Sequence, residues 1–448
     1  MPSPSSDLGS WIVLQKERSK NYLAAAVSAN SLSHERSVFG QRVMPIEGSV
    51  LASPVSAHWN PEPDYFYHWT RDAAIVMENI IPLCKGMDGA AWRAHFQDYI
   101  TFSLKTLAID GKSFSPNPLT DKTPKNYLQY VRPAEELSKL NRDALMGEPR
   151  FNPDATPDLQ KWARPQYDGP ALRAMTCLHY LEETATEKWS LPKGLENLLM
   201  LDLDFTARHS GMPCIGPWEE DNEFSHHYFT GVVQLGALQK GSKWAAGNGY
   251  DNLATRCKDA AHILEASLDQ HWSQEHRTYK AILEKPLINA EDGFDAAILM
   301  GVLHTGRENG RHSIHDERLH TTVQHMEDYF AKAYPVNHGH DTPVIGRSKS
   351  DQYFGNNPWF PTSLALTEYY YARGEITKGD KLLERLREVT PDDGSLSEQF
   401  DRANGNAVSA RHLTWSYAAF LSAARAREEA LTKQKPAVTP ALDPGHPS

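Results

Sequence analysis

Two acidic stretches far apart in the chain carry residue types that could cleave a bond between sugars. The first is Pro217-Trp218-Glu219-Glu220-Asp221-Asn222-Glu223, and the second is Ser395-Leu396-Ser397-Glu398-Gln399-Phe400-Asp401. Hydrolysis of a glycosidic bond needs two carboxyl groups, because an acid protonates the leaving oxygen while a base or nucleophile acts at the anomeric carbon. We therefore predict that Glu219 and Glu398 face each other across a sugar-binding pocket.

Composition restricts the partners of such a site. The chain has 57 Asp and Glu against 46 Lys and Arg, a net charge of −11, which disfavours a nucleic acid or an anionic membrane as partner. No stretch is apolar enough to span a bilayer. The first residues show neither a basic end nor an apolar run, so no signal peptide is visible and we expect a cytoplasmic protein.

The elements that must position these carboxylates are helices, since apolar residues recur with helical spacing and strand alternation is hard to find. Thr70 and Ser409 are expected to act as N-caps. The pattern predicts about twelve helices, near residues 10–29, 70–83, 91–109, 170–186, 194–208, 224–240, 251–272, 292–304, 317–333, 361–373, 376–389 and 409–428.

The connections between these helices alternate in length and composition. Those that follow even-numbered helices are short, whereas those that precede them are long and rich in Trp, Tyr, Pro, Gly and acids. This alternation favours six helical hairpins in a closed ring over an open α-solenoid, with the long loops gathered at the N-terminal ends of the inner helices. We expect one catalytic domain over residues 1–430, a disordered Pro-rich tail over 431–448, and no appended β-rich domain.

Five of the long loops resemble, in chain order, those of glycoside hydrolase family 15, the glucoamylase family. The matching stretches are Asp64–Asp72, Gly147–Asn152 with Trp162–Pro170, Pro217–Asn222, Gly346-Arg347 with Tyr353–Phe360, and Ser397–Gln399 with Leu413–Tyr417. The family fold is an all-α (α/α)6 barrel, which agrees with the ring of six hairpins. The resemblance therefore implies an active site built from loops at the N-terminal end of the inner helices.

The resemblance also implies a role for each matching residue. Glu219 corresponds to the general acid and Glu398 to the general base, while Arg71 and Asp72 correspond to the pair that holds the terminal glucose. The other positions matching substrate-binding residues, which would line the pocket, orient the acid or hold the second sugar, are Tyr65, Trp69, Trp162, Arg164, Asp168, Trp218, Glu220, Arg347, Trp359 and Trp415.

The implied activity is hydrolysis of α-1,4-linked gluco-oligosaccharides from the non-reducing end, with inversion and release of β-glucose. The leaving-group side departs from the family pattern, because Gln160-Lys161 stand before Trp162 where small residues are usual. We therefore expect a strict demand for terminal glucose and a looser demand on linkage. The alternatives within the family are an exo-α-1,6-glucosidase and a trehalase. We expect no starch-binding domain of the kind that many members of the family carry, which favours small soluble oligosaccharides over granular starch as substrates.

Two further classes are weighed against this activity. A catalytically silent sugar-binding protein predicts the loss of one carboxylate, yet both are present. A metal-dependent isoprenoid enzyme needs an Asp-rich or Cys/His ligand set that the sequence lacks. The histidine pairs His226-His227, His312/His315 and His338/His340 are interpreted as surface or loop residues, so no metal and no cofactor are expected.

Overall fold

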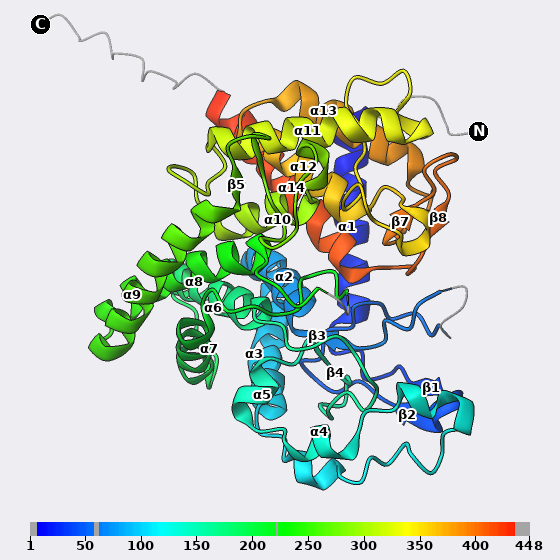
Figure 1. Cartoon of the computed structure of the whole chain (residues 1–448), viewed down its shortest axis with the longest axis vertical. Coiled ribbons are helices and arrows are strands. Elements are labelled where there is room, and N and C mark those ends of the chain that lie inside the picture. The colour runs from blue at the N-terminus through cyan, green and yellow to red at the C-terminus, as the bar shows by residue number, and fades with distance from the viewer. Residues whose placement is uncertain (1–6, 58–61, 221–222, 435–448) are drawn as a thin grey trace, which may run out of the picture.

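The computed structural model describes residues 7–57, 62–220 and 223–434, and within this part of the chain twelve long helices dominate (Figure 1). They are α1 (Leu8–Ala26), α2 (Thr70–Ile80), α3 (Gly89–Thr106), α6 (Asp168–Glu187), α7 (Leu195–His209), α8 (Tyr228–Gly247), α9 (Asp251–Leu268), α10 (Ala296–Thr305), α11 (Glu317–Ala333), α12 (Phe360–Ala372), α13 (Ile376–Val389) and α14 (Thr414–Gln434). Two short helices, α4 (Ala134–Ser138) and α5 (Arg142–Met146), lie in the long connection before α6.

Six of the long helices form a closed inner ring. Helices α2, α6, α8, α10, α12 and α14 each pack against the next in this order, and α14 returns to pack against α2. The remaining long helices lie outside, as α7 and α9 do on one side of the molecule and α11 and α13 do on another (Figure 1). The predicted alternation of inner and outer helices is therefore confirmed.

The sequences of the two rings differ as their positions require. In α10 every residue from Ala296 to Val302 is buried, which suits a helix enclosed on all sides. In α13 burial is limited to one face, made by Gly379, Leu382, Leu383, Arg385 and Leu386. An apolar stripe of this kind packs on the inner ring, and the charged remainder faces water.

Short strand pairs tie the long connections together. They are β1 (His34–Arg36) with β2 (Gln41–Val43), β3 (His68–Trp69) with β4 (Arg150–Phe151), β5 (Trp272–Ser273) with β6 (Thr278–Tyr279), and β7 (Gln399–Phe400) with β8 (Ala407–Val408), all antiparallel. The pairing of Trp69 with Arg150 joins the loop before α2 to the loop before α6. Strand β7 begins directly after Glu398.

Some predicted boundaries are wrong, and each has a local cause. Ser409 does not cap a helix, because α14 begins only at Thr414 and the Ser409 hydroxyl donates to Glu398 instead. Thr70 is the first helical residue, and Trp69 occupies the cap position without a side-chain cap bond. Helix α14 extends to Gln434, past the predicted boundary at residue 430, and the rest of the predicted tail lies outside the described residues.

None of the helices in the described ranges is long and apolar enough to cross a membrane.

Candidate active site

A cavity of about 200 Å³ lies at the N-terminal end of the inner helices. It brings together twelve of the fourteen predicted site residues: Tyr65, Trp69, Arg71, Asp72, Trp162, Trp218, Glu219, Glu220, Arg347, Trp359, Glu398 and Trp415. Ala52, Pro217, Tyr353 and Leu413 complete its lining. We name this space the catalytic cavity, since both predicted catalytic carboxylates line it.

Arg71 connects three of the loops that enclose the catalytic cavity. It stands in the first turn of α2 and is almost fully buried. Its guanidinium donates to Gln166 Oε1 at 2.8 Å, Asp168 Oδ2 at 3.1 Å and Glu219 Oε1 at 3.3 Å. Arg71 Nε also lies 3.5 Å from Asp72 Oδ2. A buried cation with this many acceptors is held in one orientation, so Arg71 fixes the wall beside the acid loop.

Asp72 presents a carboxylate to the cavity from the same helical turn. Burial raises the pKa of Asp72 to about 6, and the charge of Arg71 opposes that rise. Its Oδ2 atom has no hydrogen-bond partner among the described residues. Oδ2 is itself buried against Arg71, whereas the Asp72 side chain as a whole is 12% exposed, so the rest of the carboxyl group is the part that a hydroxyl group of a bound sugar can reach.

Glu219 is held at both carboxylate oxygens. The indole N–H of Trp69 donates to Oε1 at 2.8 Å and that of Trp162 donates to Oε2 at 2.5 Å. The Gln166 amide donates to Oε1 at 3.0 Å. The backbone φ of Glu219 is +65°, a region that non-glycine residues seldom adopt and that recurs at functional sites. Asp221 and Asn222, which follow it, lie outside the described residues.

Glu398 comes from the loop before α14 and is only 3% exposed. Burial raises the pKa of its carboxyl to about 7, while the Ser409 hydroxyl, the Arg347 charge and the Tyr65 hydroxyl each oppose the rise. Tyr65 donates to Oε1 at 3.1 Å, and Ser409 donates to Oε2. Near neutral pH this carboxyl can therefore release or accept a proton.

Aromatic rings form much of the cavity wall. The ring of Trp218 lies 5.6 Å from that of Trp359 and 6.4 Å from that of Trp415. Trp69 lies 6.1 Å from Trp162. Rings of this kind offer flat apolar faces to the C–H groups of a sugar while excluding water. The Trp218 indole is fixed by a 2.8 Å hydrogen bond to Asp295.

Arg347 and Glu220 contribute a charged pair to the lining of the catalytic cavity. Arg347 is buried and lies 3.5 Å from Glu220 Oε1, while its main partner is Asp351, with Nε at 3.0 Å from the carboxylate. Glu220 is half exposed, and burial of the rest of its side chain raises its pKa. This pair therefore lies where the wall of the cavity meets solvent.

Two predicted substrate-binding residues do not line the catalytic cavity. Asp168 is buried and accepts a hydrogen bond from Arg71. Arg164 donates to the Trp162 carbonyl oxygen at 3.2 Å and forms ion pairs with Glu148 at 3.2 Å and Asp158 at 3.3 Å. Their predicted role, to orient the acid or hold the second sugar, stays a prediction; Asp168 is linked to Glu219 through Arg71.

Four polar residues that line the site or hold its side chains were not predicted from the sequence, in addition to the apolar lining residues Ala52, Pro217 and Leu413. Tyr353 lines the cavity and its hydroxyl lies 3.0 Å from that of Tyr65. Gln166 accepts a hydrogen bond from Arg71 and donates one to Glu219. Ser409 donates to Glu398, and Asp295 accepts from Trp218. Tyr353 and Gln166 stand inside stretches that resemble the family, so the resemblance could have pointed to both residues. Ser409 and Asp295 lie outside them.

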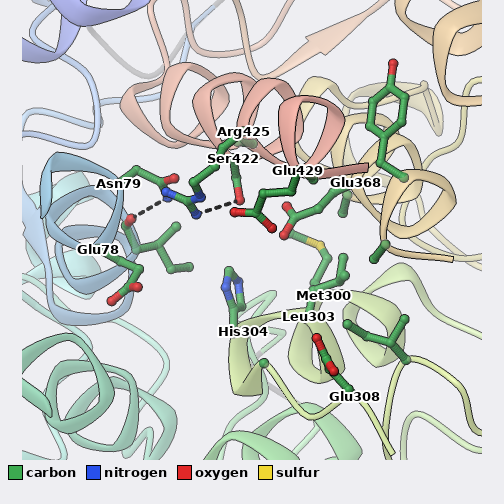
Figure 2. Close-up of a pocket in the computed structure, with 18 of the residues that line it drawn as sticks. Glu78, Asn79, Met300, Leu303, His304, Glu308, Glu368, Ser422, Arg425 and Glu429 are labelled. Carbon is green, nitrogen blue, oxygen red and sulfur yellow. Dashed lines mark hydrogen bonds between the residues drawn. The ribbon is translucent and has the colours of Figure 1, made fainter. Parts of the chain in front are cut away.

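A larger cavity of about 350 Å³ lies at the other end of the barrel, and we name it the basal cavity (Figure 2). Side chains from all six inner helices line it, and it holds neither Glu219 nor Glu398. Trp415 lines both cavities. Glu78 and Arg425 face this space in Figure 2, as does Glu368. Its size alone does not make it the site of chemistry.

The histidine pairs show ordinary hydrogen bonds. His226 interacts with the Glu284 carboxylate, and His227 Nε2 lies 2.8 Å from the Glu223 carbonyl oxygen. His312 lies 3.0 Å from the Tyr228 hydroxyl. Within the described ranges, no three or more His, Cys, Asp or Glu side chains are grouped so that they could hold a metal ion.

A family model for glycosyl hydrolases family 15 matches residues 36–425. The chain belongs to glycosyl hydrolase family 15. It is therefore a glycoside hydrolase, and the predicted family is confirmed. The match spans all five long loops that carry the resemblance.

Relatives of this family 15 hydrolase are glucoamylases. A glucoamylase of Blastobotrys adeninivorans is 26% identical over 89% of this chain and 70% of its own length. A probable glucoamylase of Schizosaccharomyces pombe is 27% identical over 85% of each chain. These relatives support a glucoamylase-like hydrolase.

Solved structures of the family share the fold. A Hypocrea jecorina glucoamylase has a TM-score of 0.76 at 24% identity and covers 94% of this chain and 73% of its own. A Saccharomycopsis fibuligera glucoamylase has a TM-score of 0.76 at 23% identity and covers 95% of this chain and 96% of its own. The predicted (α/α)6 barrel is confirmed.

Proposed function

We propose that this family 15 hydrolase removes glucose one unit at a time from the non-reducing ends of α-1,4-linked gluco-oligosaccharides, with inversion. The observation that carries the proposal is that Glu219 and Glu398 line one cavity whose wall also presents Arg71 and Asp72. The names of the glucoamylase relatives support an α-glucan as substrate. No cofactor is required, since the chemistry uses carboxyl groups and water alone.

The terminal glucose is assigned to the catalytic cavity. The Asp72 carboxyl group, which lines the cavity, accepts a hydrogen bond from a sugar hydroxyl, and Arg71 supplies the opposite charge beside it. A volume of about 200 Å³ lies below the roughly 300–1,000 Å³ typical of drug-sized ligand sites, which favours one sugar ring over a chain. With only the terminal glucose in the cavity, the bond between this glucose and the next sugar is the one that lies at the two carboxyl groups. The enzyme is therefore expected to cleave glucose from the end of the chain.

Glu219 is assigned as the general acid that protonates the leaving oxygen, and Glu398 as the base that activates water. The Trp69 and Trp162 indoles keep the Glu219 carboxyl in place. Tyr65 and Ser409 orient Glu398 and stabilise its ionised form, which offsets part of the cost of burial. Attack by water on the face opposite to the leaving group gives inversion.

The roles of the two carboxyl groups are separable with a substrate whose leaving group needs no proton. We expect Glu219→Gln and Glu398→Gln each to lower kcat on maltose by about 10²–10⁴-fold. On α-glucosyl fluoride, Glu219→Gln should regain most of its activity, whereas Glu398→Gln should not. Circular dichroism on both variants controls for folding. Recovery by Glu398→Gln instead would exchange the two roles, and an effect below about tenfold would remove a residue from the mechanism.

Linkage is the finer part of the proposal. Glu220 is half exposed beside Arg347, so the wall assigned to the second sugar is in part open to solvent. This openness favours some tolerance for α-1,6 bonds, with α-1,4 as the preferred linkage. Initial rates on maltose, isomaltose and trehalose, measured side by side, would rank the linkages. A rate on trehalose above that on maltose would overturn the α-1,4 preference.

A further inference from the structure

A lysine in the basal cavity is connected through an imidazole to a carboxylate. Glu78 on α2, His179 on α6 and Lys240 on α8 come from three successive helices of the inner ring, and all three side chains line the basal cavity. The His179 Nδ1 atom lies 2.5 Å from Glu78 Oε1, and the His179 Nε2 atom is in hydrogen-bond contact with Lys240 Nζ. We name these three residues the basal triad.

The order of the three groups fixes the direction of their hydrogen bonds. An ionised carboxylate only accepts, so we assign a hydrogen to His179 Nδ1, which donates it to Glu78. In the neutral ring the Nε2 atom then carries a lone pair, and this lone pair accepts from the Lys240 amine. In this arrangement the acid orients the base, and the base can take a proton from the nucleophile.

The surroundings of Lys240 disfavour its charged form. Burial lowers the pKa of this amine, while the Glu78 and Glu182 charges oppose that change and the Lys243 charge adds to it. The hydrogen bond of the amine goes to the His179 ring and not to a carboxylate. More of this lysine is therefore present as the neutral amine, which is the form that attacks an electrophile.

The amine can be approached from the basal cavity. The volume of about 350 Å³ falls within the roughly 300–1,000 Å³ of sites that hold small molecules. Gly306 ends α10 and lines the same cavity, and a Cβ atom there would lie 3.8 Å from Lys240 Nζ. Because glycine has no side chain, this approach to the amine stays open.

Arg425 supplies a cation close to the basal triad. It lines the same cavity, and its guanidinium donates to the Ser422 hydroxyl at 3.4 Å (Figure 2). Burial opposes a low pKa at Glu78, yet contacts with His179 and the charge of Arg425 hold that pKa below its ordinary value. The guanidinium is thus near enough to act on the triad. Its planar donors suit a phosphate group.

From these observations we propose that Lys240 is an acylation site whose donor is an acyl phosphate bound in the basal cavity. The Lys240 nitrogen attacks the acyl carbon and a C–N bond forms. The bond from that carbon to the phosphate oxygen breaks, and its electron pair stays on the phosphate, which Arg425 holds. His179 Nε2 takes a proton from the nitrogen and passes it to the departing phosphate, while Glu78 stabilises the charged ring. The product is an amide at Lys240, and its formation is independent of glucose release in the catalytic cavity.

The rate of acetylation at each lysine tests the site. The whole enzyme is incubated with acetyl phosphate, and the acetylation of individual lysines is followed by mass spectrometry of digests. A positioned base contributes about 10²–10⁴-fold, so Lys240 should react at least about tenfold faster than Lys258. Lys258 is an exposed lysine on the outer helix α9. An equal or slower rate at Lys240 would overturn the proposal.

Glu78→Gln separates a relay from an amine that is reactive only because it is buried. The Glu78 charge raises the pKa of Lys240, so its removal should speed up acetylation if burial alone makes the amine reactive. If Glu78 orients His179, the same change should slow acetylation by about tenfold or more. Glu308→Gln, at an exposed carboxylate of the same cavity, is the matched control and should leave the rate unchanged. Faster acetylation in Glu78→Gln would contradict the relay.

Two further variants test the base and the phosphate site, with circular dichroism and thermal unfolding as checks on folding. His179→Asn has no titratable ring, so Lys240 should react no faster than Lys258; an unchanged rate would show that His179 is not the base. Arg425→Gln should slow acetylation by acetyl phosphate but not by p-nitrophenyl acetate, which lacks a phosphate. Equal rates of Arg425→Gln and the parent enzyme with acetyl phosphate would overturn the choice of donor.

Discussion

Glu398 is the residue whose surroundings bear most directly on the proposed reaction. Burial raises its pKa to about 7, and the Ser409 hydroxyl works against that rise by donating to the carboxylate. A base acts only in its ionised form, so kcat/KM should fall as the pH drops through this pKa. The neighbours of Glu398 therefore set the acidic limit of activity.

Ser409→Ala should move that acidic limit to higher pH. A hydrogen bond to a charged group contributes about 1.5–3 kcal/mol, so its loss should shift the limb upward by about one unit or more. The measurement is kcat/KM on maltose across pH. Ser416→Ala is a matched control, since this buried hydroxyl donates to the Ser397 carbonyl and not to Glu398. If the acidic limb of the pH profile does not shift in Ser409→Ala, the titration of Glu398 does not set the acidic limit of activity.

Among single residues, the sequence predicts the site residues that stand in recognisable motifs. It does not predict residues that reach the site only because the fold brings distant parts of the chain together. Glu219 and Glu398 stand in distinctive stretches, so both could be predicted as a pair. Ser409 has the residue type and position of a helix cap, and only the turn before α14 directs its hydroxyl to Glu398 instead. Asp295 is one acid among many in the sequence, and its bond to Trp218 depends on packing between distant loops.

At the scale of elements, the catalytic cavity depends on how closely the N-terminal turns of α2 and α6 approach. Gly169, in the first turn of α6, lies against Thr70 at the start of α2. A Cβ atom at residue 169 would lie 2.9 Å from Thr70 Cγ2 and 3.0 Å from Thr70 Cβ. Thr70 is branched and precedes Arg71, so it cannot move aside without moving the site.

Gly169→Ala should therefore reduce activity more than it reduces stability. Overpacking of this kind costs about 1–3 kcal/mol, and displacement of Arg71 should lower kcat/KM at least tenfold. Kinetics on maltose and thermal unfolding are measured on the same samples. Gly247→Ala, at the end of α8 with no atom within 4 Å of the added Cβ, is the matched control and should keep full activity. Full activity in Gly169→Ala would show that the contact between α2 and α6 can accommodate the added methyl group without displacing Arg71.

Helical periodicity predicts the twelve long helices well, because a buried face imposes it on each of them. The predicted start at residue 224 is four residues before that of α8, because Ser225 and His227 form bridges with Cys214 and Ile282. The short helices α4 and α5 were missed, since five residues are too few to show a period. Apolar residues in the adjoining loops thus make the ends of a helix hard to predict, although the helix itself is predicted correctly.

At the scale of the whole molecule, the barrel is not filled by apolar side chains alone. The basal cavity places charged groups from several inner helices around an open space (Figure 2). Burial raises the pKa of Glu368 above its ordinary value, and the Arg425 charge only partly opposes the rise. A carboxyl with a raised folded-state pKa destabilises the fold once it ionises, so this contribution grows as the pH rises above the ordinary range of Glu.

Glu368→Gln should therefore stabilise the enzyme at neutral pH. We expect Tm at pH 7 to rise by about 1 °C or more, and the gain to vanish below about pH 4, where both side chains are neutral. Thermal unfolding across pH is the measurement. Glu308→Gln is the control, because Glu308 is exposed, lines the same cavity and does not contribute to the raised pKa of Glu368. A lower Tm in Glu368→Gln at pH 7 would show that the pairing of Glu368 with Arg425 outweighs the cost of burial.

The closed ring could be predicted from the alternation of short and long connections, which is a property of the chain as a whole. The cavities could not, because their volumes depend on how side chains from six helices meet. Trp415 illustrates this limit: it was predicted as a pocket residue, yet the structure places it between the catalytic and basal cavities.

The stereochemistry of the released glucose tests the central claim most directly. If Glu398 activates water on the face opposite to the leaving group, glucose from an α-linked substrate must leave as the β anomer. Proton NMR of maltose hydrolysis in its first minutes, before mutarotation mixes the anomers, should show the β-glucose signal rising first. An initial rise of α-glucose would contradict the inverting mechanism and would make Glu398 a nucleophile.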